Sequence, residues 1–354
     1  MTRYVKPWRQ GREILRGRIR PVEAPSVIDK YHSAEGSRTE SCNINFSLSE
    51  LFVWPTAPVR RRPLERAGIR QQKGERDMGK DVVGIAGCGA MGLPMALRLA
   101  DAGYEVWGHD VRPAAEFGGF ASRMVADAAG FSERCNIVIS VVRDAAQTRA
   151  LLFGDSQGIV RGPQIPDVLV ISSTLSPRFV RQLCEELPEG VALVDAPMSG
   201  APYRARSGTL SFMLGGSDDV LERLIPLFRV MGQDIFRMGS VSMGMTTKVL
   251  NNYCAATSVV ATHRVLGMAR ALGLDQRYLL KVMKVSSGSN WFADHIDQID
   301  WAREGYSASN TVGIVEKDVE SVLDAISEHP AVLHAPLDDA LLASLRTLEP
   351  LEID

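Results

Sequence analysis

Residues 82–92, VVGIAGCGAMG, decide how the first ordered part of this chain folds. A run of apolar residues meets a glycine-rich turn, and apolar residues such as Met95 and Leu99 then recur at helical spacing until Gly103. This order of apolar run, glycines and helical period predicts a strand, a tight turn and a helix. The free N–H groups at the start of such a helix form an anion site.

Each glycine of the turn has its own predicted task. Gly87 permits the tight turn, Gly89 lets the backbone approach a pyrophosphate, and Gly92 lets the helix pack closely on the strand. Because the glycines follow a strand and precede a helix, the pattern indicates a dinucleotide site and not merely a packing turn. We expect this site to be formed by Gly87, Gly89, Ala90, Met91 and Gly92.

A second predicted strand, 104–109, ends at Asp110, which lies 18 residues beyond Gly92. A carboxylate at about this distance accepts hydrogen bonds from the adenosine ribose of NAD and repels the 2′-phosphate of NADP. The sequence therefore favours NAD as cofactor over NADP. Two alternatives stay open: Arg112 offers a partner for a phosphate, and Asp110 has a structural reading as a solvated carboxylate at a strand end.

Strand and helix patterns continue to alternate after this unit. Apolar runs at 137–142, 168–171 and 191–194 predict strands, with helices between them ending at Phe153 and Leu187. The proline-free stretch from Met243 to about Leu272 carries apolar residues at helical intervals and predicts a long helix that leaves the sheet. The predicted fold class is α/β, with a Rossmann-type doubly wound sheet domain at 80–242 followed by an all-α domain for substrate binding and oligomerisation at 243–354.

The composition excludes several classes of protein. The chain has 354 residues, 40 Lys and Arg against 42 Asp and Glu, and 45% hydrophobic residues. No apolar run approaches the roughly 18 residues that a membrane span requires, so we expect no membrane association. The five scattered cysteines contain no CxxC pair, and the six histidines form no convincing ligand set, so we predict neither a disulfide framework nor a metal site. A reducing, cytoplasmic location is expected.

Residues 1–77 differ from the rest of the chain in charge. They hold 16 basic and 9 acidic residues, a net charge of +7, whereas the remainder has a net charge of −9. They show no sustained periodicity, so we interpret them as an irregular basic extension. The segment has no recognisable nucleic-acid motif, and we expect no nucleic-acid partner.

Two interpretations of this extension compete. Seven basic residues and one acid among the first 20 are the balance of a transit peptide, which would place the protein in the mitochondrial matrix. The preferred alternative is a translation start assigned too early, because Met78 directly precedes the first predicted strand.

Several motifs in a fixed order resemble the β-hydroxyacid dehydrogenase family, and the resemblance extends from residue 80 to about residue 330. GCGAMGLPMA resembles the family's cofactor turn, STLSP its cofactor-side loop, DAPMSGAPYRARSGTLSFMLGG its substrate loop and next strand, GMTTKVLNN its catalytic helix, and Glu316-Lys317-Asp318 its late KD element. The resemblance implies an oxidoreductase that uses NAD and assembles as a homodimer or homotetramer.

Carried over position by position, the resemblance also assigns site residues. It implies that Lys248 is the catalytic lysine, that Asn252 orients the substrate, and that Ser199 and Gly200 bind the substrate carboxylate. Ala201 stands where relatives usually have a second glycine, so the backbone there is expected to be tighter. The remaining implied residues are Val142, Thr174 and Lys317 as cofactor contacts and Trp291 as a wall of the substrate pocket, for which core packing is an equal alternative.

The chemistry of the long helix is reasonable without the family. Lys248 and Asn252 are four residues apart and share one helix face. Alcohol oxidation requires removal of the hydroxyl proton, and a lysine beside a positively charged nicotinamide and partly out of water has its pKa lowered towards neutrality. We therefore predict hydride transfer between NAD and a small 3-hydroxy acid, which gives the semialdehyde acid, with Lys248 as general acid and base.

Two other functions are weighed against this one. The first is an NADPH-dependent semialdehyde or imine reductase on the same fold, and the second is a non-enzymatic dinucleotide-binding scaffold. Lys248 separates the main prediction from both, because imine-reducing and scaffold relatives typically lack the lysine. A solvated helix lysine is the structural alternative for Lys248 taken alone.

Overall fold

The computed structural model describes residues 81–154, 158–162, 164–327, 329 and 331–353. The predicted extension at 1–77 lies outside the described residues. All described residues belong to one compact unit, 72–354.

The described strands form one sheet in the order β2-β1-β3-β4-β5-β7-β6, with β8 beside β7. Strands β1 to β5 are parallel, β7 is antiparallel to β5 and β6, and β8 is parallel to β7. The strands are β1 Val82–Ala86, β2 Glu105–His109, β3 Ile137–Ser140, β4 Val168–Ile171, β5 Ala192–Asp195, β6 Met198–Ser199, β7 Leu210–Gly215 and β8 Gly232–Gly239.

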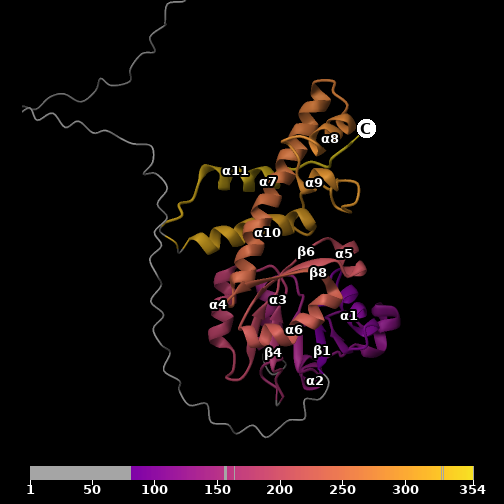
Figure 1. The fold of residues 1–354 in the computed structure, drawn as a ribbon, viewed down its shortest axis with the longest axis vertical. Coiled ribbons are helices and arrows are strands. Elements are labelled where there is room, and N and C mark those ends of the chain that lie inside the picture. Colours follow the sequence, from indigo (N-terminus) through magenta and orange to yellow (C-terminus); the bar gives the residue numbers. More distant parts are fainter. Residues whose placement is uncertain (1–80, 155–157, 163, 328, 330, 354) are drawn as a thin grey trace, which may run out of the picture. The chain divides into compact units, whose positions relative to one another are not determined.

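Helices cover both faces of this sheet, as Figure 1 shows. The helices of this part are α1 Gly92–Asp101, the 3₁₀ segment η1 Ala114–Arg123, α2 Ala128–Arg134, α3 Ala145–Phe153, α4 Pro177–Glu186, α5 Pro202–Ser207 and α6 Asp218–Met231. Strands β3 and β4 are buried along their whole length, which is typical of a parallel sheet covered on both sides. The predicted Rossmann-type sheet domain is confirmed.

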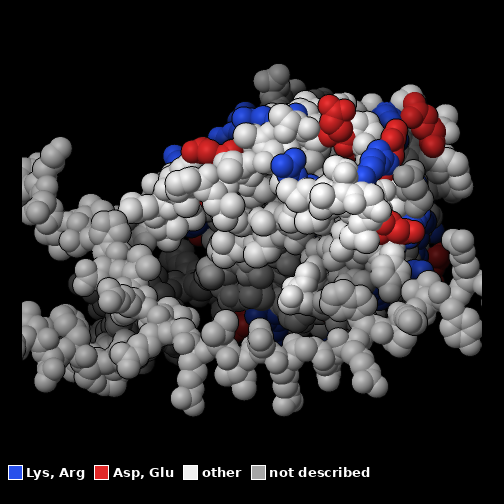
Figure 2. Space-filling model, turned by 90° about the horizontal axis from the view of Figure 1, so that it is seen from above, with Lys and Arg blue, Asp and Glu red and all other residues white. Residues whose placement is uncertain are grey.

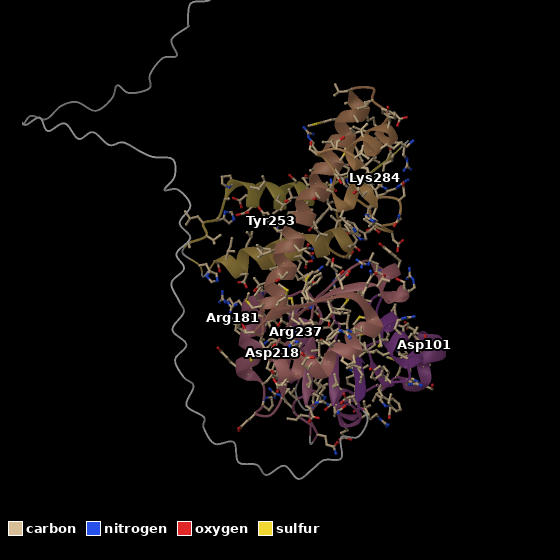
Figure 3. All side chains as sticks on the ribbon, in the orientation of Figure 1. Asp101, Arg181, Asp218, Arg237, Tyr253 and Lys284 are labelled. Atoms are coloured by element: carbon tan, nitrogen blue, oxygen red, sulfur yellow. The ribbon has the colours of Figure 1, made fainter. Side chains whose placement is uncertain are left out.

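Two hydrophobic clusters fill the space between sheet and helices. One contains Met95 and Leu99 of α1 with Phe228 of α6, and the other contains Leu152 of α3 and Leu183 of α4. The sequence did not predict β8, because its residues alternate poorly and only one of the eight is buried. At the surface, Arg237 of β8 binds Asp218 at the start of α6 with an N–O distance of 2.8 Å (Figure 3).

The predicted long helix is α7, Met243–Ala271. It leaves the sheet, and the remaining helices pack along it (Figure 1). They are α8 Gln276–Lys284, α9 Trp291–Asp294, α10 Thr311–Ile326 and α11 Pro336–Arg346. Tyr253 of α7 donates a hydrogen bond of 2.6 Å to Asp338 of α11, which ties these two helices together (Figure 3).

The surface of the described part carries both signs of charge. On the face seen in Figure 2, Lys and Arg side chains are interspersed with Asp and Glu side chains. None of the described helices combines the length and apolar character needed to cross a bilayer.

Candidate active site

The glycine turn between β1 and α1 has the shape of a pyrophosphate cradle. Gly87 has φ +92°, and a Cβ there would lie 2.7 Å from the carbonyl oxygen of Val141, while a Cβ at Gly92 would collide with the carbonyl oxygen of Gly87. A Cβ at Gly89 would meet no atom within 4 Å, so the backbone of this residue faces open space. These residues fit a dinucleotide, because a side chain at Gly89 would occupy the place where a phosphate approaches the helix N-terminus.

Asp110 follows β2 and lies beside the glycine turn. Its Oδ2 accepts a hydrogen bond of 2.8 Å from the Cys88 N–H, and its Oδ1 accepts one of 3.0 Å from Nε of Arg112. Burial acts to raise the pKa of Asp110, but the hydrogen bonds from Arg112 and Cys88 outweigh burial, and this pKa lies below its ordinary value. The carboxylate borders a cavity of about 450 Å³ that also includes His109, Met124 and Val125.

Arg112 is held in place beside Asp110. Besides the carboxylate, its guanidinium binds the carbonyl oxygen of Cys88 at 2.9 Å and lies 4.7 Å from the centre of the Phe117 ring. The side chain that the sequence offered as a phosphate partner is therefore already bound to a carboxylate, a carbonyl and an aromatic face.

The predicted cofactor contacts beyond the turn come together at the carboxyl edge of the sheet. The carbonyl oxygen of Val142 accepts a hydrogen bond of 2.6 Å from the Ser173 hydroxyl. The carbonyl oxygen of Thr174, one residue further, accepts a hydrogen bond of 2.5 Å from Nζ of Lys317 on α10. Residues that follow β3 and β4 and a residue of α10, far apart in sequence, thus meet at one edge.

Lys248 is buried at the start of α7, with only 7% of its surface exposed. Burial lowers the pKa of its ammonium to about 8; Asp318 opposes this shift and Lys317 adds to it. Within the described residues, the ammonium nitrogen of Lys248 makes no hydrogen bond or ion pair. A lysine with this pKa is in part neutral near physiological pH, and its nitrogen is available to exchange a proton.

Asn252 lies one turn beyond Lys248 on α7 and contacts α10. Its Nδ2 donates a hydrogen bond of 2.5 Å to Oδ2 of Asp318, whose Oδ1 is 2.9 Å from Nζ of Lys317. The carboxylate thereby fixes which way the Asn252 amide faces, since only the nitrogen can donate to it. Lys248 and Asn252 both lie on α7 at the predicted spacing of four residues, and Asp318 joins Asn252 to α10.

The predicted substrate loop follows β5. Ser199 lies in β6 opposite Ser211 of β7, and its hydroxyl makes no hydrogen bond with the described residues. Gly200 has φ +133°, and a Cβ there would lie 3.1 Å from Arg204. Ala201 turns the chain into α5, and its carbonyl oxygen accepts a hydrogen bond of 2.9 Å from the Arg204 N–H.

Trp291 is not brought to this cluster within the chain. Its side chain is 47% exposed and stacks on His295 with ring centres 4.8 Å apart. Asn290 attaches α9 to Thr262 of α7, 14 residues beyond Lys248 or roughly 21 Å along the helix. Trp291 is therefore neither a core residue nor a neighbour of the lysine in the described structure.

Sequence reasoning missed the part played by two carboxylates. Asp195 begins the DAPMSG motif and is fully buried, where it binds the first turn of α7. Asp318 lies in the KD element and holds Asn252. Their positions in the sequence could have drawn attention to them, because Asp195 ends a strand and Asp318 follows a predicted cofactor residue. Their contacts could not be predicted, because the partners are distant in sequence.

Comparison with known proteins gives two adjacent family matches. Residues 82–239 match the NAD binding domain of 6-phosphogluconate dehydrogenase, and residues 242–341 match the NAD-binding domain of NADP-dependent 3-hydroxyisobutyrate dehydrogenase. The boundary between the two matches falls immediately before α7.

Individual relatives agree with these matches. The mitochondrial 3-hydroxyisobutyrate dehydrogenase of Homo sapiens is 32% identical over 65% of this chain and 69% of its own length. The NAD-dependent L-serine dehydrogenase of Pseudomonas aeruginosa is 35% identical over 59% of this chain and 71% of its own length. The crystal structure of a 3-hydroxyisobutyrate dehydrogenase from Salmonella typhimurium superimposes with a TM-score of 0.64 at 25% identity, over 75% of this chain and 93% of that chain.

Proposed function

The chain belongs to the β-hydroxyacid dehydrogenase family, and from this membership we propose that it transfers a hydride reversibly between NAD and a small 3-hydroxy acid. It is an NAD-binding oxidoreductase similar to the 3-hydroxyisobutyrate dehydrogenases, and its relatives are dehydrogenases named for hydroxy acid substrates. The choice of 3-hydroxy acid and the role of the lysine are the proposed part. A homo-oligomeric state and a cytoplasmic location stay predictions.

One observation carries the proposal. Lys248 is buried, its ammonium has no hydrogen-bond partner among the described side chains and backbone groups, and its pKa is about 8. Structural lysines in proteins are usually solvated or paired, because an unpaired buried ammonium is costly. A buried lysine kept in this condition, within the motif GMTTKVLNN, favours proton transfer over a structural role.

The residues of the chain divide the reaction between them. Bound NAD supplies the hydride acceptor. Neutral Lys248 takes the hydroxyl proton as the alcohol is oxidised, and protonated Lys248 returns a proton to the oxygen in the reverse direction. Ser199 and Gly200 hold the substrate carboxylate, and Asn252, fixed by Asp318, orients the substrate without adding a charge.

The charges at the cofactor site favour NAD over NADP. A 2′-phosphate beside Asp110 meets a carboxylate, and the cation that could compensate it, Arg112, is already bound. Gly87, Gly89 and Gly92 provide the turn, with Ala90 and Met91 leading into α1.

A substrate panel tests the proposed function. Formation of NADH is measured with 3-hydroxyisobutyrate, 3-hydroxypropionate, glycerate, threonate and serine, using the wild type, Lys248→Ala and the control Lys281→Ala, which removes an exposed lysine of α8. We expect turnover of at least one acid by the wild type and the control, and its loss in Lys248→Ala.

The reductive alternative predicts a different pattern. A protein that turns over no hydroxy acid but oxidises NADPH with a semialdehyde or a cyclic imine is a reductase of that class. A protein that binds NAD and shows no turnover with any of these compounds is a scaffold.

A further inference from the structure

Asp195 ends β5 and is completely buried. Both of its carboxylate oxygens point at the first turn of α7. Oδ1 accepts a hydrogen bond of 2.7 Å from the Ser242 N–H, and Oδ2 accepts one of 2.6 Å from the Met245 N–H. A carboxylate from the sheet thus takes the place of the N-cap side chain that α7 itself lacks.

The space around this carboxylate leaves little freedom. A Cβ at Gly244 would lie 3.0 Å from Oδ2 of Asp195 and would collide with the carbonyl oxygen of Met213. A Cβ at Gly215, the β7 partner of Asp195, would collide with Oδ1. The start of α7 is therefore clamped between Asp195 and β7, at a contact that two glycines make possible.

This clamp connects the substrate loop, which contains Ser199, with the helix that carries Lys248. Ser199 follows Asp195 by four residues in the chain, and Lys248 follows Met245 by three residues, less than one helical turn. We propose that Asp195 is a positioning residue, which fixes the start of α7 and so holds Lys248 at one distance from the substrate loop. This inference rests on the proposed role of Lys248.

The cost of burying the Asp195 carboxylate also supports a positioning role. Burial raises the pKa of Asp195 to about 6, against the lowering effect of the N–H groups of Met245, Ser242, Asp195 itself and Gly244. The hydrogen bonds to this carboxylate come from backbone groups, and β4 presents Ile171 and β7 presents Gly215 opposite Asp195. The nearest titrating group along α7 is Lys248. Since the buried charge is hydrogen-bonded by backbone N–H groups and has no ion pair with a described residue, placement of the helix explains its retention better than stability does.

The substitution Asp195→Asn tests the inference with little change in size. An amide has one acceptor oxygen, so it keeps one of the two hydrogen bonds and turns a donor towards the other N–H. The start of α7 then loosens and water reaches Lys248. The first readout is the pH midpoint of Lys248 acetylation, followed by mass spectrometry on the cofactor-free protein. We expect this midpoint to rise from about 8 towards the ordinary lysine value of about 10.4.

The second readout is kinetic. A displacement of the lysine by about 1 Å is expected to lower kcat by about tenfold to a hundredfold. The dissociation constant for NAD should not change, because the glycine turn lies between β1 and α1. The control is Asp275→Ala, which removes the N-cap of α8, where Asp275 accepts a hydrogen bond of 2.7 Å from the Tyr278 N–H. This control loses stability but should keep both the Lys248 midpoint and kcat.

The outcomes are distinguishable. A folded Asp195→Asn protein with the wild-type midpoint and kcat overturns the inference. A wild type without any hydroxy acid turnover overturns the proposed function, while the acetylation midpoint still tests the clamp. Should Asp195→Asn fail to fold, hydrogen exchange of the wild-type amides of Ser242 and Met245 decides: protection equal to that of the central amides of α7 supports the clamp, and exchange at the rate of a frayed helix end refutes it.

Discussion

The protonation state of Lys248 should affect the two directions of the reaction in opposite ways. Its pKa of about 8 means that the neutral form needed for alcohol oxidation accumulates above this pH, and the protonated form needed for reduction accumulates below it. We expect the oxidation rate to rise and the reduction rate to fall as the pH passes through about 8. Lys248→Ala should lower kcat by roughly 10² to 10⁴ with unchanged affinity for NAD.

Measurement of kcat in both directions from pH 6 to pH 10, with wild type and variant, checks this prediction. Lys281→Ala serves again as control and should follow the wild-type curve. A Lys248→Ala protein that keeps most of its turnover and the same pH dependence removes the lysine from the mechanism.

The burial that suits Lys248 for proton transfer also destabilises the fold. Its folded pKa lies below the unfolded value of 10.5, so the unfolded chain binds more protons between the two pH values and stability rises with pH across that window. At pH 7 the buried charge is unfavourable by about 3 kcal/mol, to order of magnitude. We therefore expect Lys248→Met, in contrast to most core substitutions, to raise the melting temperature at pH 7 while abolishing turnover. A melting temperature of Lys248→Met below that of the wild type would contradict the prediction that the buried ammonium destabilises the fold.

Asp110 is expected to set cofactor choice at the other end of the site. We predict that kcat/KM with NAD exceeds that with NADP by at least about tenfold, which corresponds to about 1.4 kcal/mol. Asp110→Ser removes the repelling carboxylate and also frees Arg112 from its ion pair of 3.0 Å, so the ratio should shrink strongly. Arg112→Ala should leave the preference for NAD in place. Equal efficiency with both cofactors in the wild type would mean that Arg112 leaves Asp110 to bind the phosphate.

At the scale of elements, the glycine turn allows binding and folding to be tested separately. Gly89→Ala adds a methyl group that meets no protein atom within 4 Å, so the melting temperature should hold, whereas the methyl group obstructs the phosphate and the affinity for NAD should fall by at least about tenfold. The matched control is Gly267→Ala in α7, which is equally open and should bind NAD normally with slightly higher stability. Calorimetric titration with NAD and thermal melts check both variants. Normal NAD binding by Gly89→Ala would place the dinucleotide elsewhere.

The elements also differ in how far the sequence could predict them. Strands β1 to β5 were predictable because each is a short apolar run, and α7 was predictable because apolar residues recur along it at helical spacing. Strand β8 was not, because only one of its eight residues is buried and its place in the sheet depends on pairing with β7. The surroundings of Lys248 were partly predictable, since Asn252 is one turn away on the same helix. Asp318 is 66 residues from Asn252, and no local pattern reveals such a contact.

For the molecule as a whole, several contacts join α10 and the loop before it to the sheet domain. Lys317 binds the carbonyl oxygen of Thr174, Asp324 binds Ser176, and the carbonyl oxygen of Ala308 accepts a hydrogen bond of 3.0 Å from Arg143. Each pair is more than 140 residues apart in the chain. The candidate site is thus assembled from both family-matched segments, which explains why sequence motifs identified its members but not their contacts.

Folding of the described part is expected to be independent of residues 1–77. Both family matches begin after residue 81, and the first described contacts are those of Asp81, whose Oδ1 accepts hydrogen bonds from Arg223 at 2.6 Å and Asn136 at 3.2 Å. A chain that starts at Met78 keeps these contacts and all of β1. We therefore predict that it melts at the same temperature and binds NAD with the same affinity as the full chain.

A second truncation supplies the contrast. A chain that starts at Val83 loses Asp81, its ion pair with Arg223 and the first residue of β1, while removing only five residues more. Each kcal/mol lost should lower the melting temperature by roughly 2–4 °C for a domain of this size, so a measurable drop is expected here and not for the Met78 start. Thermal melts of the three chains decide. If the chain that starts at Met78 melts several degrees below the full chain, the prediction is wrong. The basic extension then contributes to the stability of the core.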